Sequence, residues 1–444
     1  MTRHAWYVAL GLALLAGAVR AEDPFLRRTT TVRVVEEAGP AVVNITTEQT
    51  VQSSPFRPFG SDPFFDRFFR DFFEPRMPQT VQNLGSGVVI DAEGHILTNE
   101  HVIARASRIR ASLADGREFD ATLVGADPNN DIAVLKIETD APLPWIAPGH
   151  SNDLMVGEPV IAIGNPFGLS HTVTTGVISA INRSIRTDAR VYHGFLQIDA
   201  SINPGNSGGP LLNAEGSLVG INTAVYGNAQ GIGFAIPIDT AQRVVSELIE
   251  HGEISPVWIG LELQDLDPRL LEALGLPPGT LGALVNRVRD TSPAQRAGLR
   301  RGDVLTRVDG QPLESARSFY ERLDTVTVGQ KLELTLQRDG AVQRLTVQAE
   351  ELPEAFVARL VEELTGLALA PAARGGYQVQ SVRSGSGGDR VGLQQGDLVL
   401  GINGRALEDE SALRRAVLHL RGQSQALLVV QRGAGRYHVA LPLL

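Results

Sequence analysis

N-P-G-N-S-G-G-P, residues 203–210, places a single serine among glycines. Gly205 lets the backbone turn so that its N–H group and that of Ser207 point at one spot, where a carbonyl oxygen would become an oxyanion. We expect Gly208 and Gly209 to leave room for a substrate backbone. The segment predicts a nucleophile loop with an oxyanion hole at Gly205 and Ser207. The alternative is a glycine-rich hairpin that happens to contain a serine.

Two further residues supply the groups that such a serine needs. A serine hydroxyl is a weak nucleophile unless an imidazole takes its proton and a carboxylate orients that imidazole. His101 follows an apolar, strand-like run, and Asp131 opens an alternating strand over residues 131–137. Taken singly, the histidine could be satisfied in a packed strand end and the aspartate could belong to a turn. The order His101, Asp131, Ser207 is that of chymotrypsin, and it predicts a catalytic triad.

Several segments extend this pattern along the chain. The chain resembles the HtrA (Deg) family of periplasmic serine endopeptidases, close to the peptidase Do type. The matching motifs are L-G-S-G-V-V-I-D (residues 84–91), T-N-E-H-V-I (98–103), D-I-A-V-L-K-I (131–137), I-G-N-P-F-G (163–168) and D-A-S-I-N-P-G-N-S-G-G-P-L (199–211). The resemblance implies a mainly β fold, with a chymotrypsin-like double β-barrel protease domain followed by two PDZ domains.

Composition limits the alternatives. A chain of 444 residues suggests about three domains, and 43% apolar residues suffice for packed cores. The chain has no cysteine, which excludes disulfides and thiolate metal sites. The nine histidines are scattered without a metal-ligand spacing, so we expect no metal and no other cofactor.

The first 21 residues read as a secretory signal. Arg3 and His4 precede an apolar core from Ala5 to Val19, and small residues suit cleavage before Glu22. An uncleaved anchor is the alternative, but the core is short of the ~20 residues that span a bilayer. We therefore expect a periplasmic protein without a stable membrane anchor. Losing two arginines changes the net charge from −10 to −12, a poor match to nucleic acid.

The mature chain divides into three predicted domains. Residues 22–253 alternate β-rich segments with Gly, Pro and Asn turns, which predicts two barrels with the triad in the cleft between them. A closing helix is expected to be capped by Asp239 or Thr240 and to end near Gly252. Residues 256–352 and 362–444 are then the two PDZ domains.

An internal repeat with a period of 94 residues marks the two PDZ domains. Residues 297–305 are echoed by residues 391–399, and the Asp309-Gly310 pair is echoed by Asn403-Gly404, each pair suiting a tight hairpin turn. A PDZ groove binds an extended peptide by strand addition and holds its C-terminal carboxylate on backbone N–H groups.

The two repeats differ in how closely their sequences resemble the carboxylate-binding loop of a PDZ domain. In the first copy Ile259, Gly260 and Leu261 resemble the carboxylate loop of a PDZ domain. In the second, residues 366–369 are a weaker counterpart, so this repeat either binds peptide or acts as a structural spacer.

An aromatic segment lies within an insertion at about residues 50–80. Between Pro55 and Pro78 it holds eight phenylalanines (Phe56, Phe59, Phe64, Phe65, Phe68, Phe69, Phe72 and Phe73). Their spacing suits a helix with an apolar stripe, which could pack on its own barrel. Because the family carries a regulatory loop here, we expect a lid or an oligomer contact.

The resemblance to trypsin-like proteases indicates which residues line the pocket that determines cleavage specificity. Ser201 lies six residues before Ser207, where trypsin has an aspartate, and Ile232 replaces a pocket glycine. This predicts a shallow apolar pocket and cleavage after small or β-branched aliphatic residues, with modest selectivity. Thr223, Ala224 and Val225 are expected to pair with the substrate backbone. Such cleavage positions are mostly buried in native proteins, which favours unfolded substrates.

The expected function is regulated, ATP-independent proteolysis of misfolded envelope proteins. We expect homotrimers or multiples of trimers, chaperone activity, and binding of C-terminal peptides at the PDZ domains. The tandem architecture suggests that peptides with apolar ends activate the protein through the first PDZ domain. One alternative is a holdase chaperone or peptide-binding scaffold with low turnover. Another is a signalling protease that cuts one membrane-anchored regulator, although such relatives usually keep an anchor and a single PDZ domain.

Overall fold

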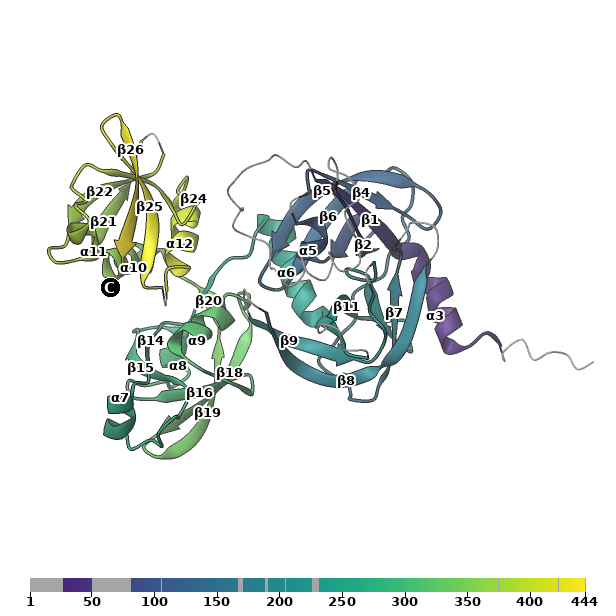
Figure 1. Ribbon diagram of the computed structural model, residues 1–444, viewed down its shortest axis with the longest axis horizontal. Coiled ribbons are helices and arrows are strands. Elements are labelled where there is room, and N and C mark those ends of the chain that lie inside the picture. The colour runs from purple at the N-terminus through teal and green to yellow at the C-terminus, as the bar shows by residue number, and fades with distance from the viewer. Residues whose placement is uncertain are drawn as a thin grey trace, which may run out of the picture. The chain divides into compact units, whose positions relative to one another are not determined.

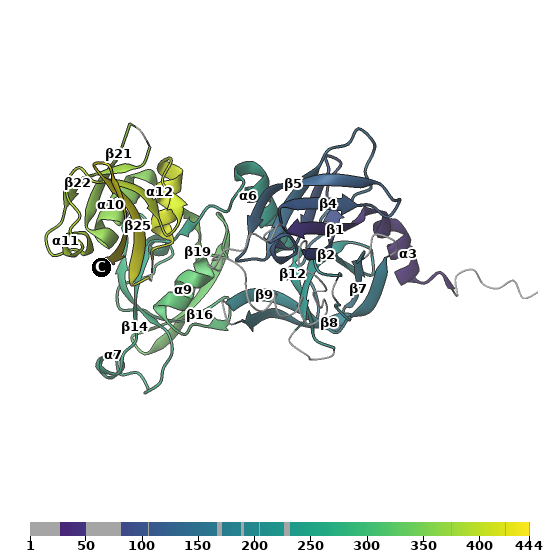
Figure 2. The same cartoon turned by 45° about the horizontal axis from the view of Figure 1, so that its top comes forward.

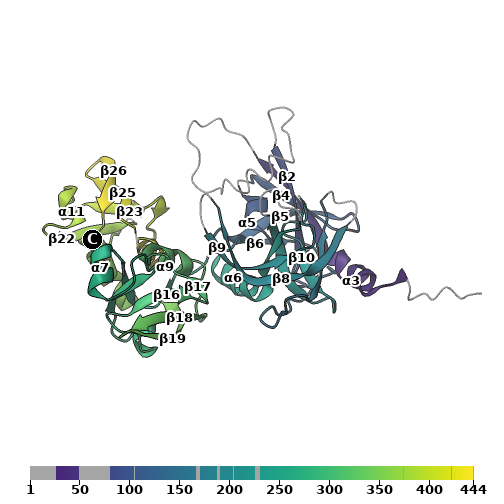
Figure 3. The same cartoon turned by 60° about the horizontal axis from the view of Figure 1, so that its bottom comes forward.

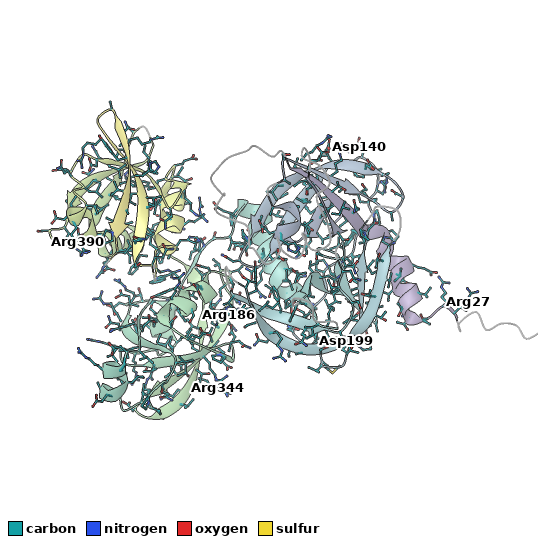
Figure 4. All side chains as sticks on the ribbon, viewed as in Figure 1. Arg27, Asp140, Arg186, Asp199, Arg344 and Arg390 are labelled. Carbon is teal, nitrogen blue, oxygen red and sulfur yellow. The ribbon has the colours of Figure 1, made fainter. Side chains whose placement is uncertain are left out.

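The computed structural model describes residues 27–49, 81–104, 106–166, 171–187, 191–203, 205–225, 231–373, 375–421 and 423–443. The expected signal (residues 1–21) and the whole aromatic insertion (50–80) lie outside them. The chain forms two compact units, Met1–Gly252 and Glu253–Leu444. Charged side chains such as Asp140, Arg344 and Arg390 are exposed on the surfaces of these units (Figure 4).

The first unit contains two closed six-stranded barrels, as predicted (Figure 1). The first barrel follows α3 (Thr30–Ala38) and the 3-10 turn η1 (Gly39–Ala41). Its strands, in hydrogen-bonded order, are β1 (Val42–Gln49), β2 (Val81–Val89), β3 (His95–Thr98), β6 (Ile132–Ile137), β5 (Glu118–Asp127) and β4 (Arg108–Ser112). The one-turn helix α5 (Glu100–Ile103) follows β3. Alternating apolar residues such as Ile45, Ile96 and Leu135 fill the interior of the barrel.

The second barrel carries the nucleophile loop at the start of one strand. Its order is β10 (Pro210–Asn213), β11 (Leu218–Val225), β12 (Gly233–Pro237), β9 (Val191–Ile198), β8 (Thr172–Arg186) and β7 (Pro159–Gly164). The long antiparallel pair β8 and β9 forms one side of this barrel (Figure 2). Because β10 begins at Pro210, the loop around Ser207 lies at the end of the barrel.

Helix α6 (Ile238–His251) closes the first unit. It packs against β5 and β6 of the first barrel and against β11 and β12 of the second. It ends at Gly252, whose φ of 75° forms a left-handed cap, as predicted. The predicted N-cap is wrong, because the helix begins at Ile238 after Pro237. The Asp239 carboxylate instead accepts hydrogen bonds from the backbone N–H (3.0 Å) and the hydroxyl (3.1 Å) of Ser151.

The second unit holds two similar six-stranded sheets. The first repeat orders its strands β14 (Leu261–Asp265), β15 (Ala283–Val288), β16 (Val304–Val308), β18 (Lys331–Arg338) and β19 (Ala341–Gln348), with β17 (Gln311–Pro312) beside β16 (Figure 3). Its helices are α7 (Pro268–Ala273), α8 (Pro293–Arg296) and α9 (Ala316–Leu323). The short strands β13 (Val257–Trp258) and β20 (Glu350–Glu351) pair with each other. Strand β14 is therefore an edge strand of its sheet.

The second repeat has the same strand order. It comprises β21 (Leu367–Pro371), β22 (Tyr377–Val382), β23 (Leu398–Ile402), β25 (Gln425–Arg432) and β26 (Gly435–Pro442), with β24 (Arg405–Ala406) beside β23. Its helices are α10 (Glu354–Thr365), α11 (Gly387–Arg390) and α12 (Glu410–Leu418). Both predicted hairpin turns are confirmed, because Asp309 and Asn403 each have a φ of 49° before a glycine of positive φ.

The repeat extends to an ion pair between an arginine and a buried aspartate. In each copy an arginine Nε donates to an aspartate over 2.6 Å, from Arg338 to Asp303 and from Arg432 to Asp397. Each aspartate also accepts a backbone N–H three residues before it over 2.8 Å. The two pairs are 94 positions apart, the period of the repeat. The same side-chain device therefore fixes the same turn in both domains.

Candidate active site

Glycines shape the loop around Ser207. Gly205 and Gly208 have φ values of 99° and 84°, in the left-handed region. A Cβ atom on Gly208 would lie 2.1 Å from the carbonyl oxygen of Ser86, and one on Gly209 would lie 2.2 Å from that of Ile163. The protein's own backbone fills these positions, so the two glycines permit close packing of the loop. From the sequence, Gly208 and Gly209 were expected to leave room for a substrate backbone, but the space beside both glycines is filled by the protein's own backbone.

His101 and Asp131 come from neighbouring parts of the first barrel. His101 lies on α5, directly after β3, and Asp131 lies in the turn between β5 and β6 with a φ of 54°. The imidazole Nδ1 is 2.8 Å and 2.9 Å from the two carboxylate oxygens of Asp131. The backbone N–H of His101 donates to the same carboxylate over 3.1 Å. The structure thus brings the predicted base and its orienting group together.

Thr223 on β11 connects this pair to Ser207. Its hydroxyl donates to Asp131 over 2.6 Å, and its carbonyl oxygen accepts the Ser207 hydroxyl over 2.6 Å. A continuous series of hydrogen bonds therefore joins Ser207, Thr223, Asp131 and His101 across the two barrels. All four are buried, with 7% exposure for His101 and at most 1% for the others. Burying the Asp131 carboxylate is tolerable because several donors compensate for its lost hydration.

Ser86 on β2 is a second connection between the barrels. Its hydroxyl donates to the carbonyl oxygen of Gly205 over 2.5 Å and accepts the backbone N–H of Asn165 over 2.7 Å. Its backbone N–H donates to the carbonyl oxygen of Ser207 over 2.8 Å. Ser86 therefore holds both ends of the segment that the sequence predicts as the oxyanion hole.

Sequence reasoning missed these supporting roles. Thr223 was expected only to pair with substrate, and Ser86 was noted only within a motif. Asn99 was also missed; its amide donates to the backbone carbonyl of Asp131 over 2.9 Å. The usable signal was the run of polar residues inside otherwise apolar strands, because a buried polar side chain requires a partner.

The predicted specificity residues lie in the second barrel, in β11 and next to β9 and β12. Ser201 is exposed after β9, and its carbonyl oxygen accepts the Thr174 hydroxyl over 2.8 Å. Ile232 is partly buried just before β12. Ala224 and Val225 belong to β11, where Val225 pairs with Gly233 after a register shift. The pocket and its selectivity stay predictions.

The predicted carboxylate loop of the first PDZ repeat, residues 259–261, leads into the edge strand β14. Gly260 has a φ of 81°, and a Cβ there would meet the Ser292 side chain at 2.2 Å. The second repeat matches this closely: Gly366 has a φ of 77°, and a Cβ would meet Ser386 at 2.1 Å. The two loops are thus structurally equivalent at their glycines, although their sequences match weakly.

Comparisons with known proteins agree with this architecture. The trypsin-like peptidase domain family matches residues 85–221, and the PDZ domain family matches residues 257–349 and 361–443. A "Probable periplasmic serine endoprotease DegP-like" of Halomonas elongata is 37% identical, covering 100% of this chain and 99% of that protein. A protein of Pseudomonas fluorescens with the same description is 37% identical over 97% of both chains.

A solved structure supports the same assignment. A variant of the HtrA-type protease AlgW, determined with a decapeptide, shares 41% identity with a TM-score of 0.51, covering 73% of this chain and 98% of that one. Two barrels followed by two PDZ repeats define a trypsin-like serine endopeptidase, in which Thr223 links Ser207 by hydrogen bonds to the Asp131–His101 pair. The chain belongs to the HtrA family, with DegP-like relatives over its full length. In the described part of the chain, no helix is long and apolar enough to cross a bilayer.

Proposed function

We propose that Ser207 is the nucleophile of an acyl-transfer endopeptidase, with His101 as general base and Asp131 as the group that orients it. The supporting observation is the series of hydrogen bonds from Ser207 through Thr223 and Asp131 to His101. For attack, the Ser207 hydroxyl leaves the Thr223 carbonyl and gives its proton to Nε2 of His101. Asp131, bound to Nδ1, holds the ring and stabilises its cation.

The backbone N–H groups of Gly205 and Ser207 are proposed to bind the oxyanion that forms on the scissile carbonyl. Each such donor contributes roughly 3–4 kcal/mol in comparable enzymes. Ser86 supports this role because it binds the carbonyl oxygens of both residues, which fixes the peptide planes that follow Gly205 and Ser207 and so anchors the loop that carries the two N–H groups. His101 then protonates the leaving amine, and water hydrolyses the acyl-enzyme.

Several finer features are part of the same proposal. Ser201 and Ile232 would form a shallow pocket that favours small or β-branched aliphatic residues in unfolded chains, and the β11 segment 223–225 would pair with the substrate backbone. We propose a periplasmic location, a cleaved signal at 1–21, and trimers or multiples of trimers with some chaperone activity. The proposed domain limits are 22–253, 256–352 and 362–444, supported by the compact unit that ends at Gly252.

Peptide binding is assigned to the first PDZ repeat. In the second repeat, the N–H groups that would hold a carboxylate are already used. The N–H of Gly366 donates to the carbonyl oxygen of Glu362 over 2.9 Å, and that of Leu367 donates to the Thr365 hydroxyl over 3.1 Å. Helix α10 runs directly into this loop and packs against both β21 and α12. The second repeat is therefore proposed to be structural.

The proposal is tested with Ser207→Ala and an unfolded substrate such as casein. Loss of the nucleophile should lower turnover by about 10⁴-fold or more, while substrate binding is retained. A matched Ser107→Ala variant, which alters an exposed serine on the same unit, should keep full activity. Cleavage by Ser207→Ala at a rate close to that of the parent would show that the nucleophile lies elsewhere. Cuts in the casein digest mainly after Lys, Arg or Phe would contradict the shallow pocket.

A further inference from the structure

The peptide-binding edge of the first PDZ repeat is already occupied. Strand addition uses the outward-facing N–H and C=O groups of an edge strand, which here is β14. The hydroxyl of Tyr320, on α9, donates to the carbonyl oxygen of Leu261 over 3.3 Å and accepts the N–H of Leu263 over 3.3 Å. One phenol therefore satisfies the two backbone groups next to the carboxylate loop that an incoming strand would use.

Arg421, beyond α12 of the second repeat, covers this phenol. Its guanidinium carbon lies 5.5 Å from the centre of the Tyr320 ring, within cation–π range. Its Nη2 donates to the carbonyl oxygen of Val257 over 2.9 Å, two residues before Ile259 of the carboxylate loop. Its Nε donates to the carbonyl oxygen of Leu418 over 2.9 Å, which anchors the arginine to its own domain. The second repeat thus holds Tyr320 in place.

Arg289 is the cation next to the carboxylate loop, and it is engaged as well. Its backbone N–H donates to the carbonyl oxygen of Gly260 over 2.9 Å. Its guanidinium binds Glu363 of α10 through two hydrogen bonds, one of 2.8 Å, and also contacts Glu262. The Arg289 side chain is only 11% exposed. The Glu363 carboxylate therefore neutralises the charge that would attract the C-terminus of a peptide.

We propose that the first PDZ groove is self-closed: the Tyr320 hydroxyl takes the place of a ligand backbone, and Arg421 of the second repeat holds it there. Glu363 of the same repeat occupies Arg289, the cation beside the carboxylate loop. A peptide with a free, apolar C-terminus binds after Tyr320 swings out and these two contacts open. The second repeat is thus an internal competitor for the peptide site. This inference rests on the proposed role of the first repeat as the peptide-binding domain.

The test measures peptide affinity in the full-length protein, in a Ser207→Ala background that prevents digestion. The probe is a fluorescent decapeptide ending in Val, followed by anisotropy. Tyr320→Phe keeps the ring and its contact with Arg421 but frees the edge of β14, so affinity should rise about threefold to tenfold. Arg421→Gln and Glu363→Gln should each raise it by a similar factor. Arg436→Gln, an exposed change on β26, should leave it within about twofold.

Thermal unfolding identifies any variant that fails to fold. Tyr320→Phe keeps the packed ring, so this variant alone is sufficient for the test if the others do not fold. Hydrogen exchange gives a second readout: the Leu263 amide should exchange faster in Tyr320→Phe than in the parent. Parental affinity in folded Tyr320→Phe, or weaker binding there, would overturn self-closure while leaving peptide binding intact. If the parent and every variant fail to bind the peptide, the proposed role of the first repeat is wrong and self-closure falls with it.

Discussion

At the scale of single residues, Thr223 holds the candidate triad together. It is the residue in the series that bonds both to Ser207 and to Asp131, using its backbone carbonyl oxygen for the first and its hydroxyl for the second. The second bond crosses between the barrels and ends on a buried carboxylate. Hydrogen bonds to buried charges are among the most valuable in a protein, so the hydroxyl of this threonine should influence catalysis through Asp131.

Thr223→Val removes the hydroxyl but keeps the backbone and the branched shape. We expect kcat to fall about tenfold or more, because Asp131 loses a charge-assisted donor and orients His101 less well. Steady-state kinetics across pH should show a displaced acidic limb as well as the lower kcat. The matched control is Thr122→Val, an exposed threonine on β5. Unchanged kcat and an unchanged pH profile in Thr223→Val would remove Thr223 from the catalytic apparatus.

At the scale of elements, tight turns are sensitive to crowding as well as to backbone angles. Gly208 and Gly157 have similar φ values, 84° and 93°. A Cβ on Gly208 would collide with Ser86 and Thr98, whereas a Cβ on Gly157 meets nothing within 4 Å. The two positions therefore separate the cost of the angle from the cost of the collision.

Gly157→Ala should lower the free energy of unfolding by about 1–2 kcal/mol, the usual cost of a left-handed alanine. Gly208→Ala carries that cost and also forces the nucleophile loop away from Ser86. We expect it to destabilise the protein by several kcal/mol and to abolish activity. Chemical denaturation of both variants measures the difference. Equal losses of stability would show that the loop relaxes without strain.

The ion pair of the second repeat predicts a pH dependence. Hydrogen bonds from Arg432, opposed by burial and assisted by the Gln394 N–H, lower the pKa of Asp397 below its ordinary value of 3.8. A carboxyl with a depressed folded-state pKa contributes stability that is present above pH 3.8 and is lost as the pH falls through the folded pKa.

Acid should therefore weaken the second repeat within that window. Asp397→Asn removes the titrating group, so its unfolding midpoint should start lower at neutral pH and change less between pH 5 and about pH 3 than that of the parent. Thermal unfolding at several pH values measures both slopes. The exposed Asp140→Asn change should retain the parental slope. If the unfolding midpoint of Asp397→Asn changes with pH as steeply as that of the parent, other carboxyl groups cause the acid sensitivity.

At the scale of the whole molecule, the two units have to communicate if peptides regulate cleavage. We expect a peptide with a free apolar C-terminus to raise the turnover of a chromogenic substrate by the intact protein. The same peptide with an amidated C-terminus should have much less effect, because the carboxylate loop binds a charged terminus. Titrating both peptides and following the initial rate measures the difference. Equal responses, or none, would contradict activation through the first repeat.

The triad, the barrels and the PDZ repeats could be predicted from the sequence because each depends on residues that are close together along the chain. Each residue of the predicted triad lies in a short motif that predicts its catalytic role: Ser207, His101 and Asp131. The 94-residue repeat likewise predicted both PDZ domains. Alternating apolar residues with frequent turn residues were sufficient for the two barrels. The error at the start of α6 arose because Asp239 had a more distant partner, Ser151, than a helix cap would provide.

The remaining features depend on residues that meet only after folding. Thr223 lies 92 positions from Asp131, Ser86 lies 119 from Gly205, and Arg421 lies 164 from Val257. No spacing rule links such pairs, because a hydrogen bond requires a direction and a distance that only packed strands and helices supply. Composition and motif therefore identify a serine peptidase with PDZ repeats. How its nucleophile is held, and how its peptide groove is closed, follow from contacts between distant segments.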